Sequence, residues 1–214
     1  MILGIMLPCL NAIAASSSAE DWSLPDSRIG TRTAPLLLLS RPDVQAELKL
    51  EPPQVSGVQK VIGDLTRRGL ALRGKTGADV IAERRAIDQA QLDWLSENLS
   101  RNQLDRLQQI EIQWEGPSAM LSRPRVGEYL KLSDQQRRAL AQILSERAAV
   151  ANLDAARRRT QGLALEERAQ ALLSSSQREL WSQLVGSPLA CFQSGPNATR
   201  DPATQRAGHT TVKP

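Results

Sequence analysis

The chain has 214 residues, a net charge of +4 and only 3% aromatic residues. Its basic residues, 22 Arg and 5 Lys, are interleaved with Asp and Glu along the chain, which is typical of solvated helix faces and argues against a nucleic-acid-binding patch. The scarcity of aromatic side chains also argues against stacking on single-stranded nucleic acid.

The N-terminal segment predicts export. The first charged residue is Glu20, and the apolar stretch before it contains Ala-Ile-Ala at residues 12–14, the spacing of small residues at a signal-peptide cleavage site. We therefore expect a signal peptide over residues 1–15 with cleavage near Ala14, Ala19 being the other candidate position, and a periplasmic or secreted mature protein. That protein would retain only Cys191, so no internal disulfide is expected. No later stretch approaches the roughly 20 apolar residues of a membrane span.

Between residues 35 and 189 the apolar residues recur at helical spacing, and no segment alternates with a period of two. The helical faces are Val58, Val61, Ile62 and Leu65; Leu104, Leu107, Ile110 and Trp114; Leu140, Ile143 and Leu144; and Leu180, Trp181 and Leu184. The sequence therefore predicts an all-α fold. Residues 16–34 read as a linker and residues 190–214, which contain few apolar residues, as a disordered tail.

An internal repeat organises the helical part. Residues 35–50 align without gaps on residues 117–132, 82 positions later, with nine of the sixteen positions identical, including Ser-Arg-Pro and Leu-Lys-Leu triplets. A second pairing relates residues 99–110 to residues 173–184, 74 positions apart. This pattern predicts two tandem helical-hairpin repeats, residues 35–116 and 117–189, packed as an elongated or curved bundle.

Four predicted helices begin with the same pattern, L-S-x-x-Q. The four starts are Leu50 with Gln54; Leu99, Ser100 and Gln103; Leu132, Ser133 and Gln136; and Leu173, Ser174 and Gln177. In the first of them Glu51 replaces Ser. The spacing predicts a capping box, in which the Ser hydroxyl accepts a backbone N–H of the first turn and the Gln side chain accepts the Ser backbone N–H. Each cap contributes about 1 kcal/mol, so a structural role accounts for the motif.

The leucines before the caps fall into two kinds. Leu50 and Leu99 precede Val55 and Leu104 at the spacing of a hydrophobic staple, whereas Leu132 and Leu173 face Arg137 and Arg178. The last two are therefore not expected to form staples.

The four starts resemble the L-T-x-x-Q motif of the CpxP and Spy-like periplasmic helical proteins. The resemblance covers roughly residues 35–189. It implies long helices in a curved hairpin that dimerises into a cradle for unfolded proteins or acts as an envelope stress sensor, so unfolded or regulatory protein partners and a homodimer are expected. Here Ser replaces Thr and the unit is duplicated within one chain, so one chain could do what a dimer does in that family.

Residues 69–76 match the phosphate-binding P-loop pattern, which requires a buried strand before the loop. Because helical periodicity precedes them, we expect a helix that ends at Gly74, followed by a turn in which Thr76 and Asp79 cap the next helix. The triplet at residues 157–159, three arginines, is expected at a helix C-terminus.

Catalytic and metal sites lack their usual residues. His209 is the only histidine, so a Ser–His or Cys–His pair has no base within the predicted helices, and Cys191 has no second metal ligand nearby. We expect no enzyme, no cofactor and no metal. The leading hypothesis is an exported, chaperone-like or envelope-stress protein that binds unfolded or regulatory proteins; the alternative is a structural or adaptor scaffold of the cell envelope with one dedicated partner.

Overall fold

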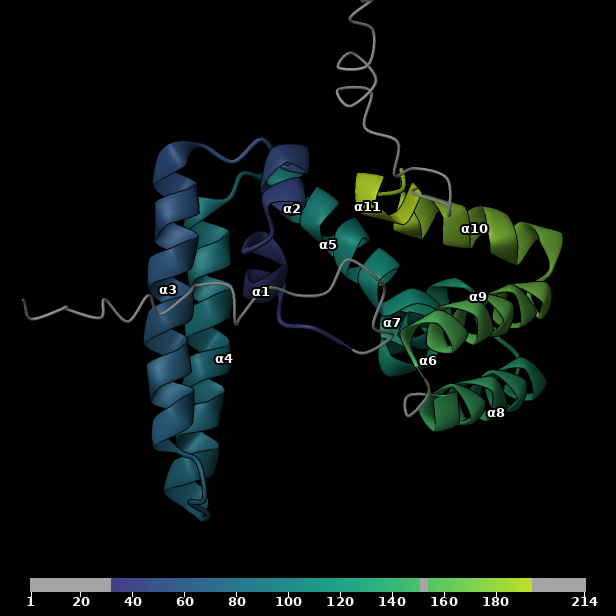
Figure 1. Cartoon of the computed structure of the whole chain (residues 1–214), viewed down its shortest axis with the longest axis horizontal. Helices are drawn as coiled ribbons and strands as arrows, with labels where there is room; N and C mark the ends of the chain where they lie inside the picture. Colours follow the sequence, from purple (N-terminus) through teal and green to yellow (C-terminus); the bar gives the residue numbers. More distant parts are fainter. Residues whose placement is uncertain (1–31, 151–153, 194–214) are drawn as a thin grey trace, which may run out of the picture.

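The computed structural model describes residues 32–150 and 154–193, and within these ranges every regular element is a helix (Figure 1). The prediction of an all-α fold is confirmed. The elements are α1 (Pro35–Leu39), α2 (Pro42–Glu47), α3 (Pro52–Ala71), α4 (Ala78–Asn98), α5 (Arg101–Glu115), the 3-10 turn η2 (Gly116–Ser118), α6 (Ala119–Ser122), α7 (Pro124–Tyr129), α8 (Asp134–Val150), α9 (Ala155–Ala171), α10 (Ser175–Val185) and α11 (Ala190–Gln193).

Proline and glycine set several of the helix boundaries. Pro occupies the first turn of α1, α2, α3 and α7, where its fixed φ suits a helix and its missing N–H costs nothing. Gly116 and Gly186 follow α5 and α10 with φ of 63° and 60°, a backbone conformation that other residues avoid. A Cβ at Gly186 would also clash with the carboxamide of Gln109, so that side chain would have to move to admit another residue.

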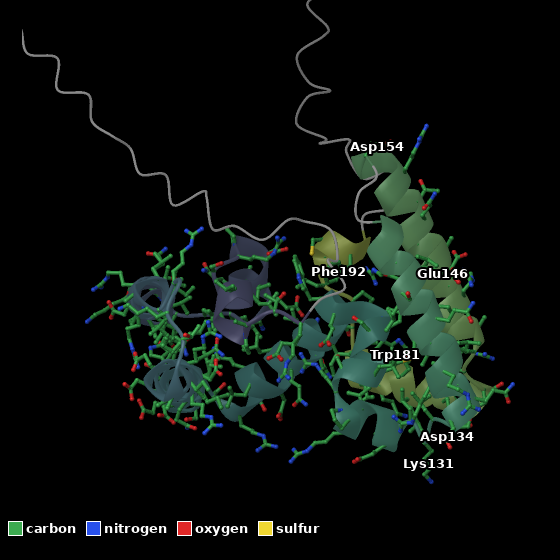
Figure 2. The ribbon with its side chains drawn as sticks, turned by 90° about the horizontal axis from the view of Figure 1, so that it is seen from below. Lys131, Asp134, Glu146, Asp154, Trp181 and Phe192 are labelled. Atoms are coloured by element: carbon green, nitrogen blue, oxygen red, sulfur yellow. The ribbon has the colours of Figure 1, made fainter. Side chains whose placement is uncertain are left out.

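The helices bury two apolar cores. The first core contains Leu36, Leu38, Leu39, Val44, Leu48, Val58, Leu95, Leu99, Leu107, Ile110, Trp114 and Leu189. The second core contains Ile112, Ala119, Met120, Val126, Leu130, Leu132, Leu140, Ile143, Leu165, Ala169, Leu173 and Trp181. Trp181 lies within the second group of helices in Figure 2. Helix α5 contributes to both cores, because Ile112 faces the second core while its neighbours Ile110 and Trp114 face the first.

Helices α3 and α4 form a long hairpin that stands beside the rest of the molecule in Figure 1. Near its base, a Cβ at Gly57 would lie 3.0 Å from the Trp94 ring, so a glycine allows α3 and α4 to approach closely there. Farther along, Arg68 of α3 donates a 2.7 Å hydrogen bond to Glu83 of α4. The corresponding hairpin of the second half, α8 and α9, is shorter at 17 residues per helix.

The turn between α3 and α4 differs from the sequence prediction in its details. A helix leads into this turn, as expected, but α3 ends at Ala71 and not at Gly74, and α4 starts after Gly77, with no side-chain cap. The expectation that Thr76 and Asp79 cap α4 is therefore wrong. Gly77 is the N-cap residue, and its φ of 115° lies in a region that glycine adopts readily and threonine avoids.

Two further expectations are corrected. The arginine triplet at 157–159 lies in the first two turns of α9, not at a helix C-terminus, and Asp154 caps that helix by accepting the Arg157 backbone N–H at 2.9 Å. Residues 190–193, where the tail was expected to start, form α11. Residues 1–31 and 194–214, including the predicted signal peptide and most of the predicted linker and tail, lie outside the described residues. None of the described helices is long and apolar enough to cross a membrane.

Candidate functional site at the paired helix starts

The four predicted helix starts meet in two pairs. In the first pair the carboxamides of Gln54 on α3 and Gln103 on α5 bond to each other: Gln54 Nε2 donates to Gln103 Oε1 at 3.2 Å, and Gln103 Nε2 donates to Gln54 Oε1 at 3.3 Å. The second hydrogen atom of each amide reaches the end of another helix, Gln54 to the Asn98 carbonyl at the end of α4 at 2.7 Å and Gln103 to the Leu48 carbonyl after α2 at 3.2 Å. We call this arrangement the first amide clasp.

The second amide clasp joins Gln136 on α8 to Gln177 on α10. Gln136 Nε2 donates to Gln177 Oε1 at 2.7 Å, and Gln177 Nε2 returns a 3.1 Å bond. Gln136 also reaches the Leu172 carbonyl at 2.8 Å, and Gln177 reaches the Leu130 carbonyl at 3.0 Å. The same set of bonds thus recurs at the offsets of 82 and 74 residues seen in the sequence.

Each glutamine also takes part in a capping box. The side-chain oxygens of Gln54, Gln103, Gln136 and Gln177 accept the backbone N–H of Glu51, Ser100, Ser133 and Ser174 at 2.8–3.0 Å. In return, the three serine hydroxyls accept the backbone N–H of their glutamines at 3.2–3.3 Å. Both donors and both acceptor positions of each carboxamide are therefore used. A glutamate could cap the helix, but it could not donate across the clasp.

The leucines of the motif lie beneath the clasps. Leu99, Leu132 and Leu173 are buried, and Leu50 packs on the first core. In the second clasp the arginines that follow take the place of a staple: Arg137 donates to the Leu132 carbonyl at 3.3 Å, and Arg178 donates to the Leu173 carbonyl at 2.5 Å. These arginines satisfy main-chain carbonyls just before each helix, a role that the hydrophobic pattern alone did not predict.

The Leu-Lys-Leu triplets form a second shared device that the sequence reasoning missed. Lys49 and Lys131 both have φ of 50°, in the left-handed region. In each case the lysine N–H bonds three residues back and the next leucine N–H bonds five residues back, to Gln45 at 2.9 Å and to Gly127 at 3.2 Å. This is a Schellman ending for α2 and α7. The identical triplets in the repeat were the available signal.

The Ser-Arg-Pro triplets place two arginines inside the protein, and these arginines have different partners. Arg41 is 6% exposed, forms a two-bond pair with Asp43 at 2.9 and 2.7 Å, and lies 5.0 Å from the centroid of the Trp114 ring. Burial works against ionisation of Asp43, but hydrogen bonds from Arg41 and Cys191 outweigh it and lower the pKa of that carboxyl.

Arg123 instead bridges two glutamates of α5. It donates to Glu115 at 2.6 Å and to Glu111 at 3.0 Å. Glu115 is only 1% exposed and also accepts a hydrogen bond from Ser122. Burial raises the pKa of Glu111, although the charge and the hydrogen bond of Arg123 act in the opposite direction. The charged cluster therefore joins the end of α5 to the start of α7 inside the molecule.

These arrangements join the starts of some helices to the ends of others. Among residues 32–150 and 154–193 no group of three His, Cys, Asp or Glu side chains is placed to hold a metal ion. No protein-family model matches the chain, and no curated protein and no solved structure matches it either.

Proposed function

We propose that this chain is an exported, non-catalytic helical protein that binds unfolded or regulatory protein partners. One observation carries the proposal: α3 and α4, with 20 and 21 residues, bury only Val58, Val80 and Leu95 between them. Such a long hairpin leaves much of its apolar surface open, including Leu70, Ile81 and Leu92, whose exposed fractions are 54%, 53% and 54%. Apolar side chains exposed together on one helix face provide the contacts that a site for other proteins needs.

The spacing of these side chains supports the same proposal. Ile81 and Leu92 are eleven residues apart on α4, so they lie on nearly the same face and about 16 Å apart along the helix axis. Exposed Arg85 and Asp88 lie between them in the sequence. A surface that mixes apolar anchors with charges of both signs suits partners that offer flexible, varied segments. The resemblance of the helix starts to the L-T-x-x-Q motif adds to the proposal.

An aggregation-suppression assay with a chemically unfolded test protein examines this function. We expect the purified chain to slow aggregation at an equimolar or higher ratio, without ATP or a metal. The double variant Ile81→Asp/Leu92→Asp should need about tenfold or more protein for the same protection, because the two lost apolar anchors together weaken binding by about 1.4 kcal/mol or more. The matched control is Leu163→Asp on α9, where Leu163 is 55% exposed. Equal loss in the control, or no protection by the parent chain, would contradict the proposal.

Cross-linking in the native cell separates the two kinds of binding protein. Many cross-linked partners would support a chaperone-like role, whereas one dominant partner would support a dedicated adaptor or scaffold of the cell envelope. The same cells, fractionated and followed by N-terminal sequencing, test export: we expect a periplasmic or secreted chain whose first residue lies near Ala14.

A further inference from the structure

The segment over residues 187–193 leaves its own half of the molecule. Helix α10 packs on the second core through Trp181, but after Gly186 the chain crosses to the first core, where Leu189 is fully buried and Phe192 packs against the cluster. The Phe192 ring lies 5.6 Å from that of Trp114. Figure 2 shows Phe192 near the middle of the molecule, between the two groups of helices. We call residues 187–193 the C-terminal plug.

Side chains of α5 hold the plug by hydrogen bonds to the main-chain atoms of the plug. Gln113 Nε2 donates to the carbonyl of Ser187 at 2.7 Å, while its Oε1 accepts the N–H of Leu189 at 2.8 Å. Arg106 donates to the same Ser187 carbonyl at 2.7 Å. Bonds to the main chain do not depend on the side chains of the segment that is held. This is how clefts bind polypeptides of varied sequence, with a few side chains as anchors.

The site that the plug fills, which we call the cleft, also contains a polar group that the plug leaves without a partner. Trp114 is completely buried, and its Nε1 donor has no hydrogen bond within the part of the chain that the structure describes. Burying such a donor costs folding free energy. A different segment that offered a carbonyl or hydroxyl oxygen to this indole would use the cleft more fully than the plug does.

We propose that the cleft lined by Asp43, Arg106, Gln113 and Trp114 binds polypeptide segments of protein partners, and that the C-terminal plug is its internal, competing occupant. The partner segment has an aliphatic anchor followed three residues later by an aromatic anchor, as Leu189 and Phe192 are in the plug, and its main chain bonds to Gln113. This inference rests on the proposed function and names a binding site for it that is separate from the α3–α4 hairpin. Since the plug is covalently attached, partners bind only to the fraction of molecules in which it has moved away.

A labelled peptide of residues 187–193, with Ser in place of Cys191, tests the proposal by fluorescence anisotropy on the full chain carrying Cys9→Ser. The variant Leu189→Asp, which releases the plug, should bind the peptide about tenfold or more tightly than the parent chain. Ala190→Asp, at an exposed position of the same segment, is the matched control and should bind like the parent. Equal affinity for the parent and the Leu189→Asp variant would overturn the proposal.

A reversible lock keeps the test decisive if Leu189→Asp fails to fold. The Cys191 thiol hydrogen-bonds to Asp43, so Asp43→Cys places a second thiol beside it. A disulfide between these two thiols should hold the plug in place and abolish peptide binding, and reduction should restore binding. Equal binding in the oxidised and reduced states would contradict the proposal.

Two further outcomes identify a different occupant or a different function. A dimer of the parent chain that Leu189→Asp abolishes would assign the cleft to a second copy and overturn the assignment to partner segments. Because the peptide is measured directly, binding without aggregation suppression would keep the cleft and reject the chaperone-like function. Aggregation suppression without peptide binding would reject the cleft and leave the chaperone-like function in place.

Discussion

Gln136 and Gln177 donate to each other's side-chain oxygens at 2.7 and 3.1 Å, while each also caps its own helix and bonds to a carbonyl at the end of another helix. Four helix ends therefore converge on two carboxamides. Only a carboxamide can serve, because the side chain must accept from its own helix and donate to its partner.

Replacing Gln136 by Glu should destabilise the protein by about 2–3 kcal/mol, since two donated hydrogen bonds are lost and a half-buried carboxylate then faces the Gln177 oxygen. Urea unfolding followed by circular dichroism measures the change. Gln135→Glu, at the exposed neighbouring position, introduces the same charge in the same turn and should change the stability by less than about 0.5 kcal/mol. A similar loss in both variants would show that the charge and not the clasp is responsible.

Lys131→Gly should stabilise the protein by about 1 kcal/mol, because its backbone has φ 50° and glycine adopts that conformation without steric cost. Thermal and urea unfolding both report this. Lys60→Gly, in the middle of α3, provides the contrast: there we expect a loss of about 1 kcal/mol, as for glycine in any helix interior. Destabilisation by both substitutions would refute the Schellman assignment.

Arg123→Met should cost about 3–5 kcal/mol, because it leaves the carboxylates of Glu111 and Glu115 buried without their shared cation. The comparison is Arg101→Met, which breaks a pair whose side chains are 86% and 57% exposed and should change the stability by less than about 1 kcal/mol. If the triple variant Arg123→Met/Glu111→Gln/Glu115→Gln recovered none of the loss, the uncompensated charges would not be its cause.

Asp43 should make the protein sensitive to acid. Its folded-state pKa lies below the ordinary value of 3.8, so its ionised form stabilises the fold above pH 3.8, and this contribution disappears as the pH falls through the folded-state pKa. We therefore expect the stability difference between the parent chain and Asp43→Asn to be largest near neutral pH and to shrink below pH 3.8. Urea unfolding at a series of pH values measures it, and a constant difference would contradict the assignment.

The contribution of Glu111 to stability should change with pH in the opposite direction to that of Asp43. Burial raises its folded-state pKa above 4.5, so the folded state favours the protonated carboxyl, and stability falls as the pH rises from 4.5 through the folded-state pKa. The stability of the parent chain relative to Glu111→Gln should therefore decrease over that interval and then level off. A relative stability that increases with pH would show that Arg123 outweighs burial.

The sequence predicted the elements whose cause is local. Capping signals at Ser100, Ser133 and Ser174 depend on neighbours within one turn, and the apolar periodicity of α3 and α5 identified residues that do face the first core. The two registers of the repeat also predicted which positions would be equivalent. These inferences required no knowledge of how the helices pack.

What the sequence did not predict depends on contacts between distant residues. The bond from Gln54 to Gln103 spans 49 positions, and no local pattern indicates which helix starts will meet. The burial of Leu189 depends on a return of the chain to Gln113, 76 positions earlier. The turn before α4 was misjudged for another reason: both Thr76 and Gly77 can precede a helix, and the backbone geometry favoured the glycine.

Helix α5 is shared by both halves, because Ile110 and Trp114 pack in the first core and Ile112 packs in the second. A chain cut after Gly116 would therefore yield a first fragment in which Ile112 is exposed to solvent. The second fragment would lack Ile112 and expose part of the second core. The halves repeat each other in sequence, yet we expect that neither folds alone and that the whole described region melts in one transition.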